Sequence, residues 1–149
     1  MPAYDINIQI VPAADYNGMA FYSFGQTRSL GVRGIQKLVN MAAKYLLTPI
    51  GTDPLDSTYG TNLTYLLGSN VALEDAREVL DAAVTSTAEA ITGWQSGDTA
   101  VPDDERLATL AVTAYIEIPD GPGFAAQILI TNVSGQQLQF LLPTLAVRQ

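Results

Sequence analysis

Apolar residues recur at a helical period in the segment that begins at Ile35. Their spacing of i, i+3, i+4, i+7 and i+11 places them on one stripe of an amphipathic helix. The residues of this stripe are Ile35, Leu38, Val39, Ala42 and Leu46. The residues that face away from it are polar, namely Gln36, Lys37, Asn40 and Lys44. We predict that the helix ends at Thr48, because Pro49 bars the residue before it from the α region.

The loop that follows, 51–62, carries two large apolar side chains among residues typical of turns. Glycine, proline and aspartate suffice to reverse a chain, so an ordinary loop needs no apolar anchor. We therefore expect Leu55 and Tyr59 to hold this loop against the rest of the protein in a fixed shape. Leu63 then starts another short helix.

The longest helical pattern runs from Leu73 to Trp94. Its apolar stripe consists of Leu73, Ala76, Leu80, Val84, Ile91 and Trp94. Glu74 and Asp75 fall in the first turn, where the helix dipole favours anions. A loop rich in glycine, serine, aspartate and proline follows from residue 95 to 104, and we expect it at the surface.

The last third of the chain changes its apolar period from 3.6 to 2. In its first strand the apolar face consists of Leu110, Val112, Ala114, Ile116 and Ile118. Two more strands are predicted at 124–131 and 136–142, the last one ending at Pro143. The connections are short, so the strands form a three-stranded antiparallel meander. Helices first and strands last predict an α+β fold, with the helices packed on the C-terminal sheet.

A further strand is predicted near the N-terminus, where Tyr4, Ile6, Ile8 and Ile10 alternate with polar residues. The short apolar run from Met19 to Phe24 is either a strand or a plug. The first strand either pairs with the protein's own sheet or is an arm lent to a neighbour. We favour the first alternative, because an isolated exposed strand promotes aggregation. The chain thus reads as one domain, 1–149, with an N-terminal extension (1–26), a helical part (27–95) and a sheet part (104–143).

A resemblance to a known family rests on the order and spacing of several short motifs. The first is Arg28-Ser29-Leu30-Gly31-Val32-Arg33, directly before the helix. The second, after the helix, is Gly51-x-x-Pro54-x-Asp56-x-x-Tyr59-Gly60-x-x-Leu63. In this order they resemble the gene 25-type baseplate wedge proteins of contractile-tailed bacteriophages, which are related to baseplate components of contractile injection systems. The resemblance continues to Ile130 and covers roughly two thirds of the chain.

The resemblance implies a structural protein and not an enzyme. Members of the family sit in the baseplate wedge, bundle a helix with other wedge proteins around the hub or tube, and join the first ring of tail sheath. Their sheet accepts strands from the sheath protein, which initiates sheath assembly. For this chain it implies several copies in a six-fold assembly, located in the tail baseplate of a virion assembled in the host cytoplasm.

Two features of the sequence are physical counterparts of these roles. Outside the stripe, Met41, Ala43, Tyr45 and Leu47 leave the helix apolar more than halfway round its C-terminal end. The helix therefore has two surfaces to bury, and we expect the stripe from Ile35 to Leu46 to bind partners. No lysine or proline protects strands 107–118 and 124–131 from pairing with another chain. We expect Leu129 and Leu138 to lie where partner strands are taken up.

A third motif lies where the long helix passes into the sheet. Family members carry Glu-Pro-Arg there, and this chain has Asp104-Glu105-Arg106. An arginine can grip a carboxylate with two hydrogen bonds and so fix the geometry of a junction. We therefore expect Asp104 and Arg106 to contribute to a partner interface. The family's proline is Glu105 here, so the backbone shape of this corner is not fixed by a ring.

The charge distribution adds a further expectation. The net charge is −8, which argues against non-specific nucleic-acid binding. Acids are absent from residue 16 to 52, where four basic residues lie, and all fifteen acids fall elsewhere. This asymmetry has two interpretations. The charges either lie on an ordinary solvated surface, or they give the molecule one basic and one acidic end suited to oriented docking.

The residues that are missing narrow the chemistry. The chain has no cysteine or histidine, so a typical zinc site and a thiol nucleophile are not expected, and no residues point to a cofactor. No apolar run is long enough to cross a membrane and no secretory signal opens the chain.

The alternative function from another class is a muramidase-like peptidoglycan hydrolase, which needs only two carboxyl groups. The candidates are Asp53 with Asp56, or the cluster at 103–105. Each group also has a simpler explanation as turn or surface residues. A small adaptor that shares the fold without a tail is a second alternative.

Overall fold

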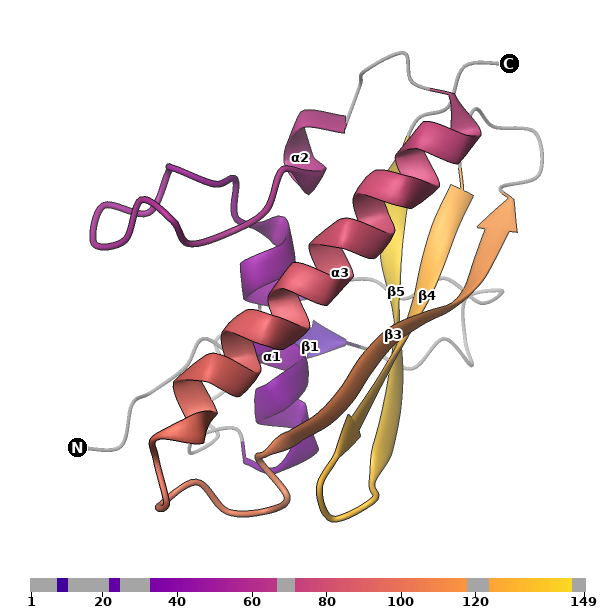
Figure 1. The fold of residues 1–149 in the computed structure, drawn as a ribbon. Helices are drawn as coiled ribbons and strands as arrows, with labels where there is room; N and C mark the ends of the chain where they lie inside the picture. Colours follow the sequence, from indigo (N-terminus) through magenta and orange to yellow (C-terminus); the bar gives the residue numbers. More distant parts are fainter. Residues whose placement is uncertain (1–7, 11–21, 25–32, 67–71, 118–123, 146–149) are drawn as a thin grey trace.

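The helical half of the chain precedes the sheet in sequence and lies against it in space (Figure 1). The computed structural model describes residues 8–10, 22–24, 33–66, 72–117 and 124–145. The elements in chain order are β1 (Ile8–Ile10), β2 (Tyr22–Phe24), α1 (Ile35–Leu47), α2 (Leu63–Leu66), α3 (Leu73–Ser96), β3 (Leu107–Glu117), β4 (Phe124–Asn132) and β5 (Gln137–Leu145).

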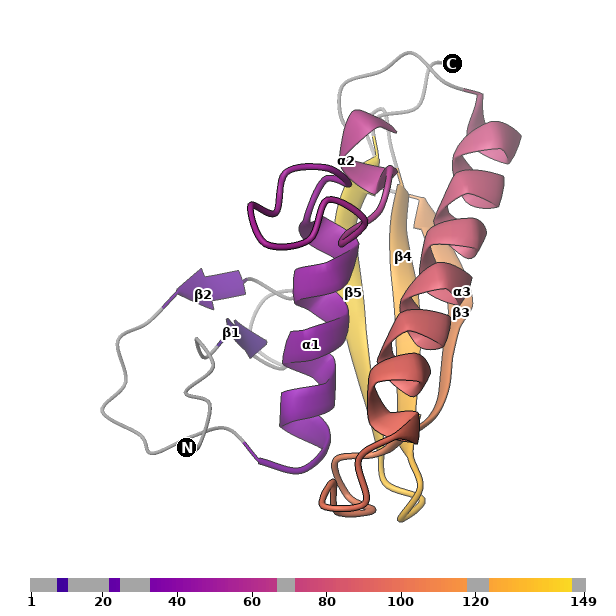
Figure 2. The same cartoon turned by 60° about the vertical axis from the view of Figure 1, so that its left-hand side comes forward.

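The sheet is an antiparallel meander in the order β3-β4-β5. Helices α1 and α3 lie on the same face of it, with α3 over β3 and α1 over β4 and β5 (Figures 1 and 2). This arrangement confirms the predicted α+β fold with helices packed on a C-terminal meander. None of the described helices combines the length and apolarity that a membrane crossing requires.

Helix α1 forms where the apolar stripe predicted it. Gly34 precedes it with a φ of 63°, a conformation in which glycine is unstrained. Thr48 ends it with extended backbone angles, as Pro49 requires, and the Thr48 hydroxyl donates a hydrogen bond to the carbonyl of Lys44 at 2.7 Å. The predicted boundary of this helix is confirmed.

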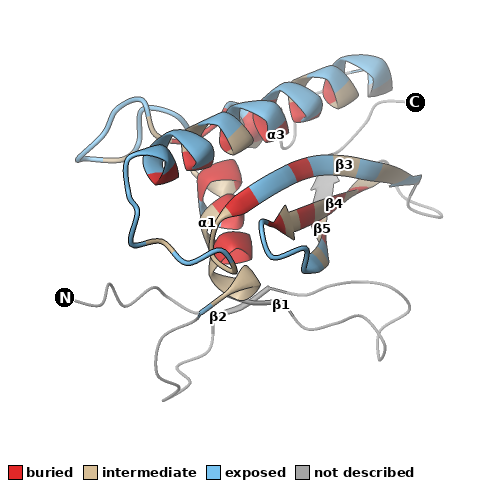
Figure 3. Cartoon of the chain, turned by 60° about the horizontal axis from the view of Figure 1, so that its bottom comes forward, coloured by how far each residue is buried: buried red, intermediate tan, exposed pale blue. Residues whose placement is uncertain are grey.

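The core lies between the two long helices and the inner face of the sheet. Phe140 and Ile128 are cross-strand partners at its centre, and neither has more than 2% of its surface exposed. The fully buried helical side chains that meet this face are Leu38, Val39, Leu46, Leu80 and Ile91. Figure 3 shows that the buried positions of α1 and α3 face inward. At about 1.5–3 kcal/mol for each large apolar side chain, this burial is the main favourable term in folding.

A bulge in β3 changes which residues face the core. Val112 pairs with Ile128 but Ala114 pairs with Gln127, so no residue of β4 lies opposite Thr113 in the register. The extra residue shifts the alternation by one. Ile116 is therefore turned to the outer face, where 45% of it is exposed, and Tyr115 takes the place on the helix side. The prediction that Ala114 and Ile116 share the core face was wrong, and Ile118 lies outside the described residues.

Tyr115 uses its position beneath α3 to join the helix to the sheet. Its hydroxyl donates a hydrogen bond to Asp81 Oδ1 at 2.6 Å, and the Arg77 guanidinium lies 4.8 Å from its ring centroid. Partial burial raises the pKa of the Tyr115 phenol, and the hydrogen bond to Asp81 raises it further. The bulge thus replaces an apolar contact with a polar link.

The two ends of the described chain differ from expectation. β1 pairs with β2 as a separate two-stranded sheet, with Ile8 opposite Phe24, and within the described residues it does not pair with the main sheet. The preference for pairing with the main sheet was therefore wrong, while Tyr22–Phe24 is a strand and not a plug. β5 continues through Pro143 to Leu145, because proline is tolerated in an edge strand.

Candidate partner-binding surfaces

The apolar stripe of α1 serves the protein's own core. Leu38, Val39, Ala42 and Leu46 have no exposed surface, and Ile35 is partly buried against the same cluster. This corrects the expectation that the stripe binds partners, because a partner cannot reach these side chains without opening the core. The sequence could not separate the two uses, since both need the same periodicity.

The second apolar side of α1 is also largely used within the chain. Ala43 has no exposed surface and Tyr45 only 7%. Asn40, which we expected to face solvent, is 1% exposed, and its Oδ1 accepts a hydrogen bond from Gln36 Nε2 at 3.4 Å. Among the residues of α1, Lys44 keeps an exposed side chain. The surface that α1 offers to other proteins is therefore small.

Tyr45 belongs to an aromatic group that joins three separate parts of the chain. Its ring meets Tyr59 of the loop edge-on at 4.8 Å between centroids and Trp94 of α3 edge-on at 5.6 Å. Tyr59 and Trp94 stack at 5.7 Å with an interplanar angle of 6°. Aromatic pairs at such distances stabilise by about 0.5–1.5 kcal/mol beyond their buried area. Tyr59 is therefore the anchor that we predicted for the loop, but Trp94 is 46% exposed and is not a core residue.

Leu55, the other predicted anchor, does not pack against the protein. Its side chain is 95% exposed at the tip of the loop, so this prediction was wrong. The tip is shaped by its own carboxylates. Asp53 Oδ1 accepts hydrogen bonds from the backbone N–H of Leu55 at 2.8 Å and of Asp56 at 3.3 Å. Asp56 Oδ1 accepts bonds from both the N–H and the hydroxyl of Thr58.

The base of the loop is closed by backbone pairing. Thr61 N donates to Thr48 O at 2.9 Å, and Ile50 N donates to Thr61 O at 3.0 Å. The Thr61 hydroxyl donates to the carbonyl of Leu46 at 2.8 Å and accepts from Leu63 N. Gly60 has a φ of 106°, and a Cβ built on it would lie 2.3 Å from Thr48 O. The glycine of the Tyr59-Gly60 motif is therefore required for this close approach.

The corner before β3 is fixed by Glu105, which stands where the resembled family has proline. Glu105 Oε2 lies 2.6 Å from Lys37 Nζ on α1, and Glu105 Oε1 accepts a hydrogen bond from Gly34 N at 3.3 Å. Glu105 N donates to Pro102 O at 2.9 Å. Asp104 lies beside the start of α1, since a Cβ on Gly34 would be 3.3 Å from Asp104 Oδ2. The sequence pointed to Asp104 and Arg106 but missed Glu105.

Arg106 holds backbone and not a carboxylate. Its Nη2 donates hydrogen bonds to the carbonyls of Asp98 at 3.1 Å and Val101 at 3.0 Å. Both acceptors lie in the surface loop between α3 and β3. In this structure Arg106 shapes its own loop, and its contribution to a partner interface stays a prediction.

Two buried amides complete this corner, and no sequence pattern pointed to either. Gln95, near the end of α3, donates from Nε2 to Glu105 O and accepts from Leu107 N, both at 2.8 Å. Asn132, at the end of β4, donates from Nδ2 to Asp104 O at 2.8 Å. They are 6% and 1% exposed, so their hydrogen bonds satisfy groups that would otherwise be buried without partners.

The two residues predicted to take up partner strands occupy different positions. Leu129 lies in β4, which pairs on both sides, and its side chain is half-buried on the outer face. Leu138 lies in the edge strand β5, but its side chain packs against the core. Neither backbone position combines an open edge with an outward side chain. The strand edges of the meander belong to β3 and β5, and not to β4 as the pattern of 124–131 suggested.

The outer face of the sheet is uncharged over its described positions. Its members follow from the register of the three strands. They are Thr109, Ala111, Ala114, Ile116, Ala125, Gln127, Leu129, Thr131, Gln137, Gln139 and Leu141. Gln127 Nε2 donates to Gln139 Oε1 at 2.8 Å across two of the strands. Depletion of charge is typical of the buried centre of protein interfaces.

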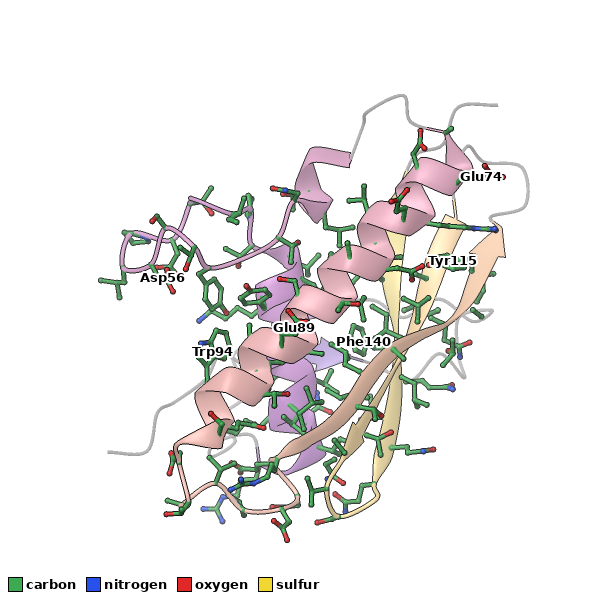
Figure 4. All side chains as sticks on the ribbon, viewed as in Figure 1. Asp56, Glu74, Glu89, Trp94, Tyr115 and Phe140 are labelled. Carbon is green, nitrogen blue, oxygen red and sulfur yellow. The ribbon has the colours of Figure 1, made fainter. Side chains whose placement is uncertain are left out.

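Three of the carboxylates considered for hydrolysis, those of Asp53, Asp56 and Glu105, are engaged in local structure. Hydrogen bonds from the Thr58 side chain and backbone lower the pKa of Asp56 below the usual 3.8 of an aspartate, whereas a general acid needs a raised pKa. In Figure 4, Asp56 lies in the loop and apart from Glu74 and Glu89 of α3. Over the described residues, no three acidic side chains gather in a way that could hold a metal ion.

Comparison with known proteins adds no family to this geometry. No protein-family model matches the chain, and no curated protein matches it.

Proposed function

We propose that this protein is a structural component of a contractile tail baseplate wedge, which joins the wedge to the first ring of tail sheath and initiates sheath assembly. The order of its sequence motifs and its α+β fold support the proposal. The loop motif also has a structural role at each of three positions: Asp56 shapes the tip, Tyr59 anchors the loop and Gly60 closes its base.

The observation that carries the proposal is the outer edge of β3. This strand has eleven residues and, within the described part of the chain, it pairs on one side only. It contains no lysine or proline, which are the residues that commonly prevent edge strands from pairing with other chains. A partner strand can add to such an edge through backbone hydrogen bonds.

Within β3, the segment Thr109–Val112 fits this role best. It lies between two register shifts, at 107/109 and 112/114, and pairs residue by residue with β4. Thr109 and Ala111 are exposed on the uncharged outer face. A sheath strand added here is adjacent to neutral side chains and therefore buries no unpaired charge.

On α1, a narrow side of the helix contacts other wedge proteins. Since the apolar stripe is buried, the side that remains is the one with Gln36, Lys44 and Leu47, which lie on one flank of the helix at i, i+8 and i+11. In the assembled baseplate the protein is present in multiples of six copies, in contact with sheath, wedge and hub or tube proteins.

Assembly with the sheath protein of the same particle tests the proposal. The double variant Thr109→Lys, Ala111→Lys places two charges on the β3 edge, and we expect at least a tenfold loss of sheath binding. Ala82→Lys, on the exposed side of α3, is the matched control and leaves binding unchanged. Circular dichroism confirms that all variants are folded. Normal sheath assembly by the double variant would overturn the strand-sharing proposal.

A further inference from the structure

Leu55 is far more exposed than any other large apolar side chain in the described part of the chain. Its exposed fraction is 95%, whereas those of Ile50, Trp94, Ile116 and Val133 lie between 40% and 48%. Exposing a leucine forgoes the favourable free energy of removing its side chain from water. A single exposed leucine needs no explanation when it lies on a flexible segment, so the rigidity of its surroundings decides the matter.

The loop that carries Leu55 has a fixed shape. The Leu55 N–H is held by Asp53 Oδ1 at 2.8 Å, and the next turn is held by Asp56 through Thr58. At its base, Thr48 and Thr61 pair through their backbones, and Tyr59 stacks on Trp94. A side chain presented by a rigid loop loses little conformational entropy when it binds.

The surroundings of Leu55 indicate the chemistry of its partner. Asp53 and Asp56 flank it, and no basic residue occurs from Gly51 to Asn62. An aspartate is ionised at neutral pH, and the hydrogen bonds from Thr58 lower the pKa of Asp56 below its usual value. An apolar pocket that receives Leu55 therefore brings its rim close to two carboxylates, and lysine or arginine on that rim complements them.

The position of the loop separates Leu55 from the β3 edge. Figures 1 and 2 show the loop beside the C-terminal end of α1 and α2, on the opposite side of the molecule from β3. A strand added to the β3 edge does not reach the loop. Leu55 therefore belongs to a second surface of the protein, separate from the β3 edge.

We propose that Leu55 is an anchor that inserts into an apolar pocket with a rim of lysine or arginine on a neighbouring wedge protein. This inference rests on the proposed function, since it names the partner of a second surface of the same baseplate component. The loop acts as a preformed hot spot, with one apolar side chain at the centre and carboxylates around it.

The probe for the test is the wedge subcomplex of the same particle, purified without this protein. Dissociation constants are measured for the wild type and for Leu55→Ala. Because burial of a leucine corresponds to about tenfold to a hundredfold in affinity, we expect Leu55→Ala to raise Kd by that factor. Val133→Ala is the matched control: it removes an exposed apolar side chain from the β4–β5 turn and changes Kd less than twofold.

The charge component is measured separately with Asp56→Asn. Asparagine keeps an acceptor for the turn and removes the charge, so Kd becomes less dependent on salt while the loop remains formed. Leu55 makes almost no contact within the protein, so thermal unfolding of Leu55→Ala stays that of the wild type.

The possible outcomes distinguish this inference from the proposed function. If the wild type binds the wedge subcomplex and Leu55→Ala binds it equally well, the anchor is overturned while the proposed function stands. If the wild type binds neither wedge subcomplex nor sheath, the proposed function fails and the anchor fails with it. If Leu55→Ala loses wedge binding but still joins the sheath, both are supported.

Discussion

Lys37 Nζ on α1 lies 2.6 Å from Glu105 Oε2 at the corner before β3, and the two residues are 68 positions apart in the chain. Glu105 is 12% exposed and Lys37 39%, so the pair is partly shielded from water. Within the described part of the protein, no other pair of side chains forms an ion pair. It fixes the start of the first helix to the point where the chain enters the sheet.

Replacing this carboxylate tests its contribution to stability. Glu105→Gln is expected to lower the free energy of unfolding by about 1 kcal/mol, because the partly exposed ion pair is lost while a weaker hydrogen bond can remain. A double-mutant cycle with Lys37→Met, measured by urea unfolding, should give a coupling of about 0.5–1 kcal/mol. The coupling should shrink in about 1 M salt, where surface charges are screened.

Two further variants make this prediction specific. Glu89→Gln removes an exposed carboxylate of α3 and should change stability by less than about 0.5 kcal/mol. Glu105→Pro introduces the residue of the resembled family, but it removes both the ion pair and the Glu105 N–H bond to Pro102 O. It should therefore destabilise more than Glu105→Gln. A coupling near zero would mean that the corner is held by Gln95 and Asn132 alone.

The close approach at Gly60 predicts a large effect of a single methyl group. Gly60→Ala places a Cβ against the Thr48 carbonyl at a φ of 106°, so we expect a loss of about 2–4 kcal/mol in the free energy of unfolding. Gly51 also has a positive φ, of 83°, but open space around its Cα. Gly51→Ala is therefore the matched control and should lose only about 1–2 kcal/mol. Equal losses for the two variants would contradict the role of the Thr48 contact.

The turn at the tip of the loop predicts that the free energy of unfolding depends on pH in the acid range. Because the Thr58 hydrogen bonds lower the pKa of Asp56 in the folded protein, the unfolded chain binds a proton more readily in acid. The stabilising effect is therefore complete above about pH 3.8 and is lost as the pH falls through the lower pKa of the folded state. Carbon NMR of the Asp56 carboxyl group should show titration below 3.8, and Thr58→Ala should raise the pKa. A pKa at or above the usual value in the wild type would contradict the turn.

Helical and strand periodicity was enough to predict the elements but not every side-chain position. The α1 stripe was found because five apolar residues repeat over three turns. In the loop, Leu55 and Tyr59 are both large and apolar, and without a repeating geometry their order in the sequence does not say which one points inward. The bulge at Thr113 has no sequence signal either, although it changes the face of every later residue in β3.

The candidate interfaces were harder to predict than the fold. Burial of the α1 stripe depends on how the sheet and α3 are placed, which a local pattern does not contain. From the sequence, Glu105 was interpreted only as the absence of a proline that would fix the backbone. In the structure its side chain forms an ion pair with Lys37, which is distant in sequence. The burial of Gln95 and Asn132 could not be predicted, because it depends on nearby backbone groups that need a hydrogen-bond partner.

The backbone pairing between Thr48 and Thr61 has a consequence for how this protein can evolve. Since both ends of the intervening segment are fastened to the body, the residues at its tip can be exchanged or lengthened without rearranging the helices and the sheet. Sequence variation can therefore accumulate in this one short stretch while the rest of the architecture is inherited intact.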